Sequence, residues 1–292
     1  MDSCCPGRPV TGAGYDRSML NANHRWRVAL LAACAAGPLC AADRDWLTIE
    51  GDYLIGASVV SGNGHVGDAP VRYDLKPMWA FQLGPFRVSR SRASSLMQAG
   101  REQLETGVSA DFGIFDDWRA SASLRVDNGR DFGGDPRFAG LPDVRSTLRW
   151  RLSTGSTIGE RWSWSSSYDR DFMGRSGGAR LLAGLNYRLP ITESNYWDLS
   201  LGSTWGDRTY LQTTYGISSD TAARTGRSPY GLGSGWENVR ASAQYTHVLS
   251  DHWVVFGGLD LSRMVSSPAR SPLVGRQTTH TISAGIAFRG KR

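Results

Sequence analysis

Residues 279–289, near the C-terminal end of the chain, read THTISAGIAFR. Ile282, Ala284, Ile286 and Phe288 share one parity, whereas the intervening positions are small or polar. Successive side chains of a β-strand point to opposite faces, so this pattern predicts a strand with one apolar face. A last strand that ends in an aromatic residue, in a chain that begins with an export signal, indicates an outer-membrane β-barrel.

The N-terminus has the three-part layout of a secretory signal peptide. Arg25 and Arg27 precede the apolar run VALLAACAA at 28–36, and Cys40-Ala41-Ala42 offers small residues for cleavage. We therefore predict cleavage after Ala42, which divides the chain into an extension and signal peptide (1–42) and a barrel domain (43–292). Met19 is a plausible true start. Two weaker interpretations of these residues are a buried helix of a soluble domain and a lipoprotein cleavage box at Leu31-Ala32-Ala33-Cys34.

Composition limits the class of the main body. Hydrophobic residues make up 40% of the chain, mean hydropathy is -0.34, and no run of about 18 apolar residues predicts a transmembrane helix. Barrel strands escape such a search because half of each strand faces a polar interior. All four cysteines precede residue 43, which excludes disulfide, metal-thiolate and thiol chemistry from the body. The mild positive excess of the body gives no reason to invoke nucleic acid.

Alternation along residues 43–292 predicts an all-β fold, a transmembrane antiparallel up-and-down barrel of about 12 strands. The expected strands are 46–60, 71–83, 86–94, 105–115, 118–126, 144–152, 160–168, 179–188, 196–205, 238–247, 252–264 and 279–289. Short connections alternate with long ones, as in outer-membrane barrels with short periplasmic turns and long extracellular loops. The short ones are 84–85, 116–117, 153–159, 189–195 and 250–251. The long ones are 61–70, 95–104, 127–143, 169–178, 206–237 and 265–278.

Aromatic residues gather near the expected short turns, as in a girdle at one membrane interface. They are Trp79, Phe81, Phe86, Phe115, Trp118, Trp150, Trp162, Trp197, Trp253 and Phe288. A water-soluble β-sandwich or lipocalin-like barrel is the alternative, but it would not need aromatics at one end.

Charged residues share the parity expected for the barrel lumen. They are Arg72, Asp74, Glu105, Asp111, Arg119, Arg125, Arg145, Arg149, Arg151, Asp198, Arg240 and Asp260. Arginines beside carboxylates either fill the interior with stabilising ion pairs or line a narrow pore. We favour the stabilising network.

A search for catalytic or cofactor-binding motifs gives little. The glycine-rich stretch 231–235 has no helix to follow it, and no His-Glu-x-x-His motif occurs. His65 and His280, with loop aspartates, could form a rim catalytic site, but no nucleophile motif accompanies them, so solvated loop histidines are the better interpretation. We therefore expect no enzyme activity, no catalytic or metal site and no cofactor.

Three stretches resemble the MipA/OmpV family of outer-membrane proteins. The first is 127–131 with 141–144, and the others are 210–230 and 266–274. The positions that carry the likeness in the last two are Tyr210, Tyr215, Gly216, Gly226, Tyr230, Pro268, Ser271 and Pro272. The resemblance covers most of 45–290.

The resemblance implies a non-enzymatic scaffold in the Gram-negative outer membrane that joins a murein lytic transglycosylase and a bifunctional penicillin-binding protein for peptidoglycan synthesis and remodelling. The other partner expected for the protein is the lipid of the outer membrane. The expected periplasmic side has only short turns, whereas the largest loop, 206–237, is outside. That topology keeps two alternatives open, a narrow solute pore and a surface adhesin.

Overall fold

The computed structural model describes residues 53–66, 71–90, 107–115, 118–130 and 138–290. The predicted signal peptide, its cleavage after Ala42 and the Met19 start lie outside the described residues. So do Glu105 and residues 46–52 of the predicted first strand.

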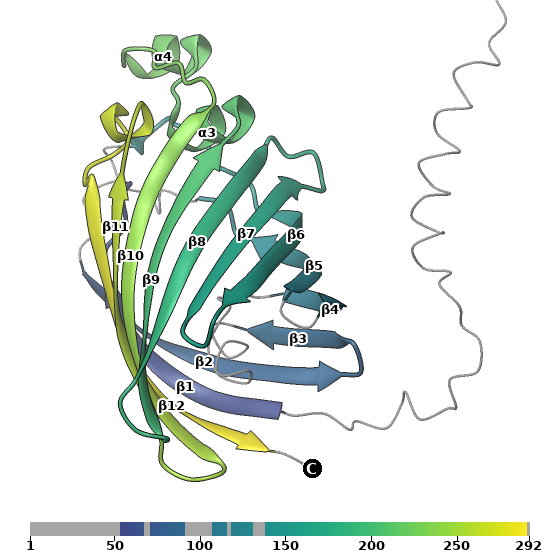
Figure 1. Cartoon of the computed structure of the whole chain (residues 1–292). Coiled ribbons are helices and arrows are strands. Elements are labelled where there is room, and N and C mark those ends of the chain that lie inside the picture. Colours follow the sequence, from purple (N-terminus) through teal and green to yellow (C-terminus); the bar gives the residue numbers. More distant parts are fainter. Residues whose placement is uncertain (1–52, 67–70, 91–106, 116–117, 131–137, 291–292) are drawn as a thin grey trace, which may run out of the picture. The chain divides into compact units, whose positions relative to one another are not determined.

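Twelve antiparallel strands form one closed barrel in which each strand pairs with its neighbours in sequence and β1 pairs with β12 (Figure 1). The predicted fold class is confirmed. The strands are β1 Tyr53–Gly62, β2 Arg72–Leu83, β3 Phe86–Arg90, β4 Gly107–Phe115, β5 Trp118–Asp127, β6 Thr147–Ile158, β7 Trp162–Asp171, β8 Ala179–Pro190, β9 Asn195–Gly206, β10 Gly235–Val248, β11 Trp253–Met264 and β12 Thr278–Gly290.

Several predicted strand ends are wrong. The predicted turn at 153–159 is almost entirely strand, because β6 continues to Ile158 and pairs with β5 as far as Ser156 and with β7 as far as Ile158. Its serines, threonines and glycine have the composition of a loop, but small polar side chains also suit the inner wall of a barrel. Strand β7 likewise runs three residues past the predicted end at Tyr168, to Asp171. That extension places Asp169 on the barrel wall.

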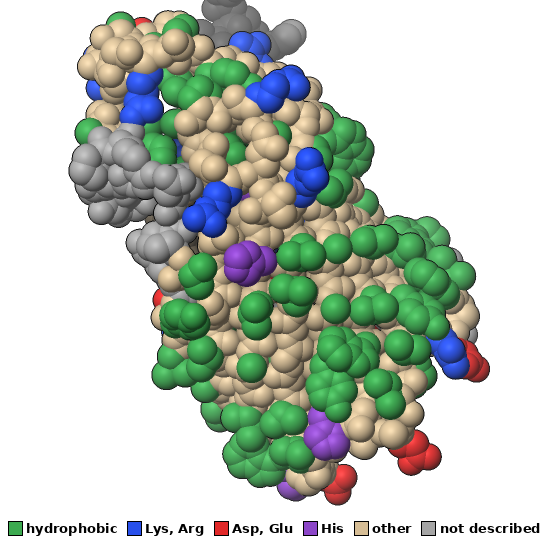
Figure 2. Space-filling model, turned by 90° about the vertical axis from the view of Figure 1, so that its left-hand side faces the viewer, with side chains coloured by type: hydrophobic (Ala, Val, Ile, Leu, Met, Phe, Trp, Pro, Cys, Tyr) green, Lys and Arg blue, Asp and Glu red, His purple; other side chains and the backbone are tan. Residues whose placement is uncertain are grey.

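Exposure alternates along the strands with the predicted parity. In β12, Ile282 and Ile286 are 54% and 43% exposed, whereas Ser283 and Ala287 are 6% and 0% exposed and face the interior. Outward-facing large hydrophobic residues recur around the barrel, and Figure 2 shows them spread over the wall. Ring closure leaves no unpaired sheet edge, as a bilayer requires, and the apolar exterior suits contact with lipid. The molecule is therefore a transmembrane barrel.

Short turns and long loops alternate as predicted. The short connections include 159–161, 191–194 and 249–252, and the long ones include 207–234 and 265–277. Strand β1 begins and β12 ends on the short-turn side. We call this side the periplasmic side and the other the outer side.

The interior is mostly polar, with one apolar cluster near the periplasmic side. This cluster contains Leu54, Met78, Ala80 and Ala287, against which Phe256 packs. The outer loops contain helices α3 (Arg208–Tyr215), α4 (Ser219–Thr225) and the 3-10 helix η3 (Pro268–Arg270). Among the described residues, no helix combines the length and apolar character needed to cross a bilayer.

Candidate functional site: the barrel lumen and its loop cap

A buried carboxylate organises the outer half of the lumen. Asp169 is 0% exposed and accepts hydrogen bonds from three arginines of the neighbouring strands. Its Oδ1 lies 2.9 Å from Arg149 Nε and 3.0 Å from Arg180 Nε, and its Oδ2 lies 2.6 Å from Arg151 Nη2 and 3.0 Å from Arg180 Nη2. In the sheet register Arg151, Asp169 and Arg180 are direct cross-strand partners on β6, β7 and β8. We call Asp169 and its three arginines, Arg149, Arg151 and Arg180, the charge layer.

Helix α3 lies over this layer. The Tyr210 ring centroid is 5.7 Å from the Arg149 guanidinium carbon and 5.2 Å from that of Arg180, within the range of a cation–π interaction. Asp207 caps the helix, since its Oδ1 accepts from the Tyr210 backbone N–H at 2.7 Å. Arg149 also donates to the carbonyls of Gly177 and Gly178 at 2.8 and 3.1 Å. The β7–β8 loop, α3 and the charge layer therefore form one bonded unit.

Glu237, buried at the start of β10, binds the two tyrosines of α3. The Tyr210 and Tyr215 hydroxyls both donate to its Oε1, at 2.8 and 2.6 Å. Burial first, and then the negative charge of Glu237, raise the pKa of each phenol above its ordinary value. Both phenols therefore stay protonated, which their role as donors requires.

The outer loops pack into a small second core, which we call the loop cap. One of its clusters contains Tyr210, Leu211, Tyr215, Leu232 and Met264, and a second contains Ile217, Ala222 and Leu273. Side chains from 63–66 and 138–141 also pack against these clusters. The cap thus joins four of the outer loops.

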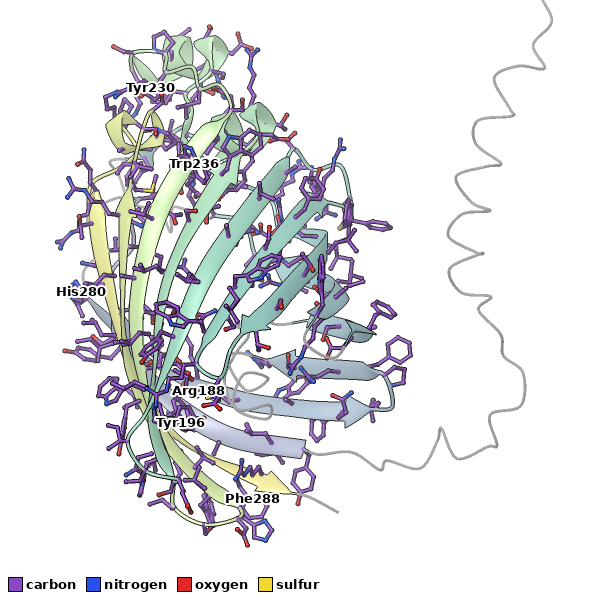
Figure 3. All side chains as sticks on the ribbon, in the orientation of Figure 1. Arg188, Tyr196, Tyr230, Trp236, His280 and Phe288 are labelled. Carbon is purple, nitrogen blue, oxygen red and sulfur yellow. The ribbon has the colours of Figure 1, made fainter. Side chains whose placement is uncertain are left out.

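The residues of the family-like motif meet in the loop cap. The Tyr230 hydroxyl, near the top of Figure 3, donates to the Ser267 carbonyl at 2.8 Å, and the Ser271 hydroxyl donates to the Tyr215 carbonyl at 2.6 Å. Gly226 ends α4 with φ 67°, a left-handed conformation that favours glycine, and Gly216 ends α3. Pro268 begins η3, and Pro272 is exposed beside Ser271.

The lumen charges predicted from parity divide into three groups. Arg125, Asp260, Arg149 and Arg151 are buried in the interior. Two carboxylates pair with arginines outside the predicted set: Asp111 with Arg87 at 3.2 Å, and Asp198 with Arg188 at 2.8 Å. Arg188 also lies over the Tyr196 ring, 4.3 Å from its centroid (Figure 3).

The remaining predicted lumen charges are less enclosed. Asp74, Arg119 and Arg240 have the inner parity of their strands but are exposed. Arg145 is wrong as a lumen residue, because it lies in the loop before β6 and is exposed. The side chain of Arg72 is outside the described part of the structure.

Sequence reasoning missed Asp169, Arg180 and Glu237. Arg180 shares the parity of Arg188 on β8 and could have been found from it. The sequence pattern predicts that the seventh strand ends at Tyr168, which places Asp169 in a loop, whereas β7 continues to Asp171. Glu237 lies before the predicted start of the tenth strand, and no sequence signal marks it.

The aromatic girdle is placed as predicted except at Trp150. This residue pairs with Arg170 and Leu124 near the outer ends of their strands, because β6 is six residues longer at its periplasmic end than predicted. Phe115 has no described side chain. The others lie near periplasmic strand ends, and several are in contact, as in Trp162–Tyr187 at 4.7 Å and Trp253–Phe288 at 5.2 Å between ring centroids.

The two histidines considered for catalysis lie on opposite faces of the sheet. The His65 ring contacts Ser262 Oγ at 3.1 Å and Thr279 Oγ1 at 3.2 Å on the inner side, so its interpretation as a solvated histidine is wrong. His280 has the outward parity of β12 and points away from the barrel (Figure 3). No group of three or more His, Cys, Asp or Glu side chains within the described ranges could hold a metal ion.

The sequence profile of the MltA-interacting protein MipA family matches residues 55–290, from β1 to β12. The chain belongs to this family. Comparison with curated protein sequences gives no significant match.

Solved structures with a similar fold are membrane barrels. The NanC porin matches with 9% identity and a TM-score of 0.43, over 80% of this chain and 98% of that chain. The anion-selective porin from Comamonas acidovorans matches with 10% identity and a TM-score of 0.39, over 82% and 98%. The translocator domain of the autotransporter NalP from Neisseria meningitidis matches with 10% identity and a TM-score of 0.36, over 94% and 98%.

Proposed function

We propose that this MipA-family barrel is a non-enzymatic scaffold in the Gram-negative outer membrane. In this proposal it holds murein-remodelling enzymes, a lytic transglycosylase and a bifunctional penicillin-binding protein, at the inner face of that membrane. The description of the family, which names an interaction with MltA, supports a protein partner. The loop cap also supports a structural role, because side chains from four outer loops pack together there.

The observation that carries the proposal is a pair of exposed apolar side chains at the periplasmic tips. Ile191 and Leu249 are 57% and 54% exposed in adjacent turns, which are tied by a bond from the Val248 N–H to the Ser194 carbonyl at 2.9 Å. Both lie beyond the girdle residues of their strands. Exposed Glu193 and Asp251 flank them. Exposed apolar side chains flanked by charged residues are typical of a protein-binding surface.

Site-specific photo-crosslinking in intact cells tests the scaffold. A photoreactive phenylalanine analogue replaces Leu249 or Ile191, and mass spectrometry identifies what is captured. We expect murein-remodelling enzymes at these positions and none at Pro272, an exposed residue of the outer side that serves as the control. Capture of no such enzyme at Leu249 and Ile191, with cell-wall enzymes present and the barrel folded, would contradict the scaffold.

A narrow solute pore is the second candidate, favoured by the polar lumen. Its test is conductance in planar bilayers. Arg149→Glu should change the conductance, since it reverses a charge in the charge layer. A silent bilayer with correctly inserted protein would eliminate this candidate and leave the scaffold unaffected.

A further inference from the structure

An exposed arginine follows the apolar wall at the outer end of β11. Arg263 has the outward parity of this strand, in which Leu259 and Leu261 are 40% and 43% exposed. Its cross-strand partners are exposed Thr278 of β12 and Val239 of β10, which is 45% exposed. The outward surface of the barrel therefore changes from apolar to basic at this point.

The position of Arg263 along β11 matches the outer boundary of the hydrocarbon layer. It follows Trp253, a residue of the periplasmic girdle, by ten positions. At about 3.3 Å per residue and a strand tilt of about 35–45°, this separation corresponds to a height of about 23–27 Å. The lipid-facing apolar band of outer-membrane barrels is about 25 Å tall, so Arg263 lies at the level of the outer lipid head groups.

A second arginine, Arg276, is held at the same end of β12. Its N–H donates to the His65 carbonyl at 3.3 Å, and its carbonyl accepts from His65 Nδ1 at 3.1 Å. Arg276 is exposed and precedes Thr278, the partner of Arg263, by two residues. His280 follows Thr278 by two residues and points away from the barrel (Figure 3). We call Arg263, Arg276 and His280 the rim cluster.

The described residues supply no carboxylate to the rim cluster. The outward faces of β1, β2 and β10 to β12 carry no Asp or Glu within the described ranges, and neither does the loop 265–277. Glu237 of β10 is buried against α3, and Asp260 of β11 is buried with inner parity.

The charges of the surface are also divided between the two ends of the barrel. Figure 2 shows Lys and Arg side chains over the outer end, above the apolar wall, and most of the Asp and Glu side chains toward the opposite end. The rim cluster therefore presents positive charge at the level where the phosphates of the outer leaflet lie.

From these observations we propose that the rim cluster binds a phosphate group of an outer-leaflet lipid. Arg263 and Arg276 pair with the phosphate oxygens, His280 donates from its ring to the head group, and Leu259 and Leu261 contact the acyl chains. Guanidinium groups form strong charge-assisted bonds to phosphate, and basic clusters at a membrane surface recognise anionic head groups. This binding rests on the assignment of the outer side and does not depend on the scaffold.

Native mass spectrometry of the full-length protein, folded in detergent micelles and titrated with lipid, tests the proposal. Diphosphorylated lipid A is the probe, the same lipid without its phosphates supplies the acyl chains alone, and inorganic phosphate supplies the anion alone. We expect a saturable one-to-one complex with the probe. Each comparison compound should bind at least about tenfold more weakly, the effect of losing one charge-assisted bond or more.

A double variant and a control locate the binding. Arg263→Gln combined with Arg276→Gln should weaken binding of the probe by about tenfold or more, and each single change should weaken it severalfold. Arg224→Gln is the matched control, because Arg224 is an exposed arginine of α4, at the top of Figure 1 and beyond the barrel wall. This variant loses the same charge and should bind as the wild type does.

The outcomes that would overturn the proposal are distinct. They are absence of a complex with the probe, equal affinity for the lipid without phosphates, unchanged affinity in the double variant, or an equal loss in Arg224→Gln. The side chains of Arg263 and Arg276 form no ion pair or hydrogen bond within the described part of the chain. The double variant should therefore keep its fold, which circular dichroism checks.

Discussion

At the scale of single residues, Asp169 is the most consequential side chain in the barrel. Three arginines bind one carboxylate that is 0% exposed, whereas Asp127, which lies 3.7 Å from Arg149, is 31% exposed. Asp169 therefore supplies most of the buried compensating charge. Removing one partner of a buried ion pair leaves uncompensated charge, which costs far more than the pair itself contributes.

Asp169→Asn should therefore destabilise the folded barrel by about 3–5 kcal/mol. Urea titration in micelles, followed by circular dichroism, measures the loss. Asp198→Asn is the control, and it should cost less because Asp198 and Arg188 are 18% and 17% exposed to the lumen. Equal losses in the two variants would contradict the role given to the charge layer.

His65 provides a pH-dependent contact at the same scale. Burial lowers its pKa below the ordinary 6.5, and the ring joins Ser262, Thr279 and the Arg276 carbonyl. His65 binds a proton more readily in the unfolded segment than in the folded one. The contact therefore stabilises the fold fully above pH 6.5, and this stabilisation is lost as the pH falls through the lowered pKa of the folded state.

The protection factors of the amides in residues 274–280, which compare exchange in the unfolded chain with exchange in the folded protein at the same pH, should thus fall below about pH 6, where unfolded histidine is mostly protonated. Hydrogen-exchange mass spectrometry at pH 5.0 and 7.5 makes the comparison. His65→Gln should abolish the pH dependence, whereas His252→Gln, on the periplasmic side, should preserve it. A pH response that survives in His65→Gln would assign the effect to another group.

At the scale of elements, α3 depends on a close approach by the β7–β8 loop. Gly178 has φ 55°, and a Cβ there would lie 2.3 Å from both Asp207 Oδ1 and the Tyr210 nitrogen, the two atoms of the helix cap. Gly174, in the same loop, has φ 67° but has open space around it. An alanine at either position would be strained by the positive φ, but only an alanine at Gly178 would also clash with the helix cap.

Gly178→Ala should therefore detach α3 while leaving the barrel closed. Limited trypsin digestion should cut at Arg224 and Arg227 several times faster than in the wild type. Gly174→Ala should pay only the left-handed backbone cost of about 1 kcal/mol and resist trypsin as before. Equal protection in both variants would show that α3 does not need the close approach.

At the scale of the whole molecule, the pairing of β12 with β1 closes the barrel. Val59 lies opposite Ala284 in this seam, and Ala57 lies opposite Ile286. Directly opposed residues of antiparallel strands have Cα atoms about 4.5–5.5 Å apart, within the range of a disulfide.

A Val59→Cys and Ala284→Cys pair should oxidise to a disulfide and lock the ring. The test is made in a chain whose Cys4, Cys5, Cys34 and Cys40 are serine. Ala57→Cys with Ala284→Cys, displaced by two residues, is the control and should cross-link poorly. Altered migration of the boiled protein on gels reports the bond, and preferential linking of the control pair would overturn the register.

The sequence alone determined the strand number, the in–out parity, the side of each loop and most of the aromatic girdle. These follow from local alternation, which depends only on the period of a β-strand. Strand ends in Ser- and Gly-rich stretches could not be predicted, because small polar residues suit both a turn and a lumen wall; the end of β6 and the position of Trp150 were wrong for that reason.

Only the tertiary structure decided which charges meet. Parity places Arg149, Arg151 and Arg180 inside, but the register of β6, β7 and β8 brings them to Asp169. The folded outer loop brings Tyr210 over Arg149 and Arg180 and its hydroxyl to Glu237.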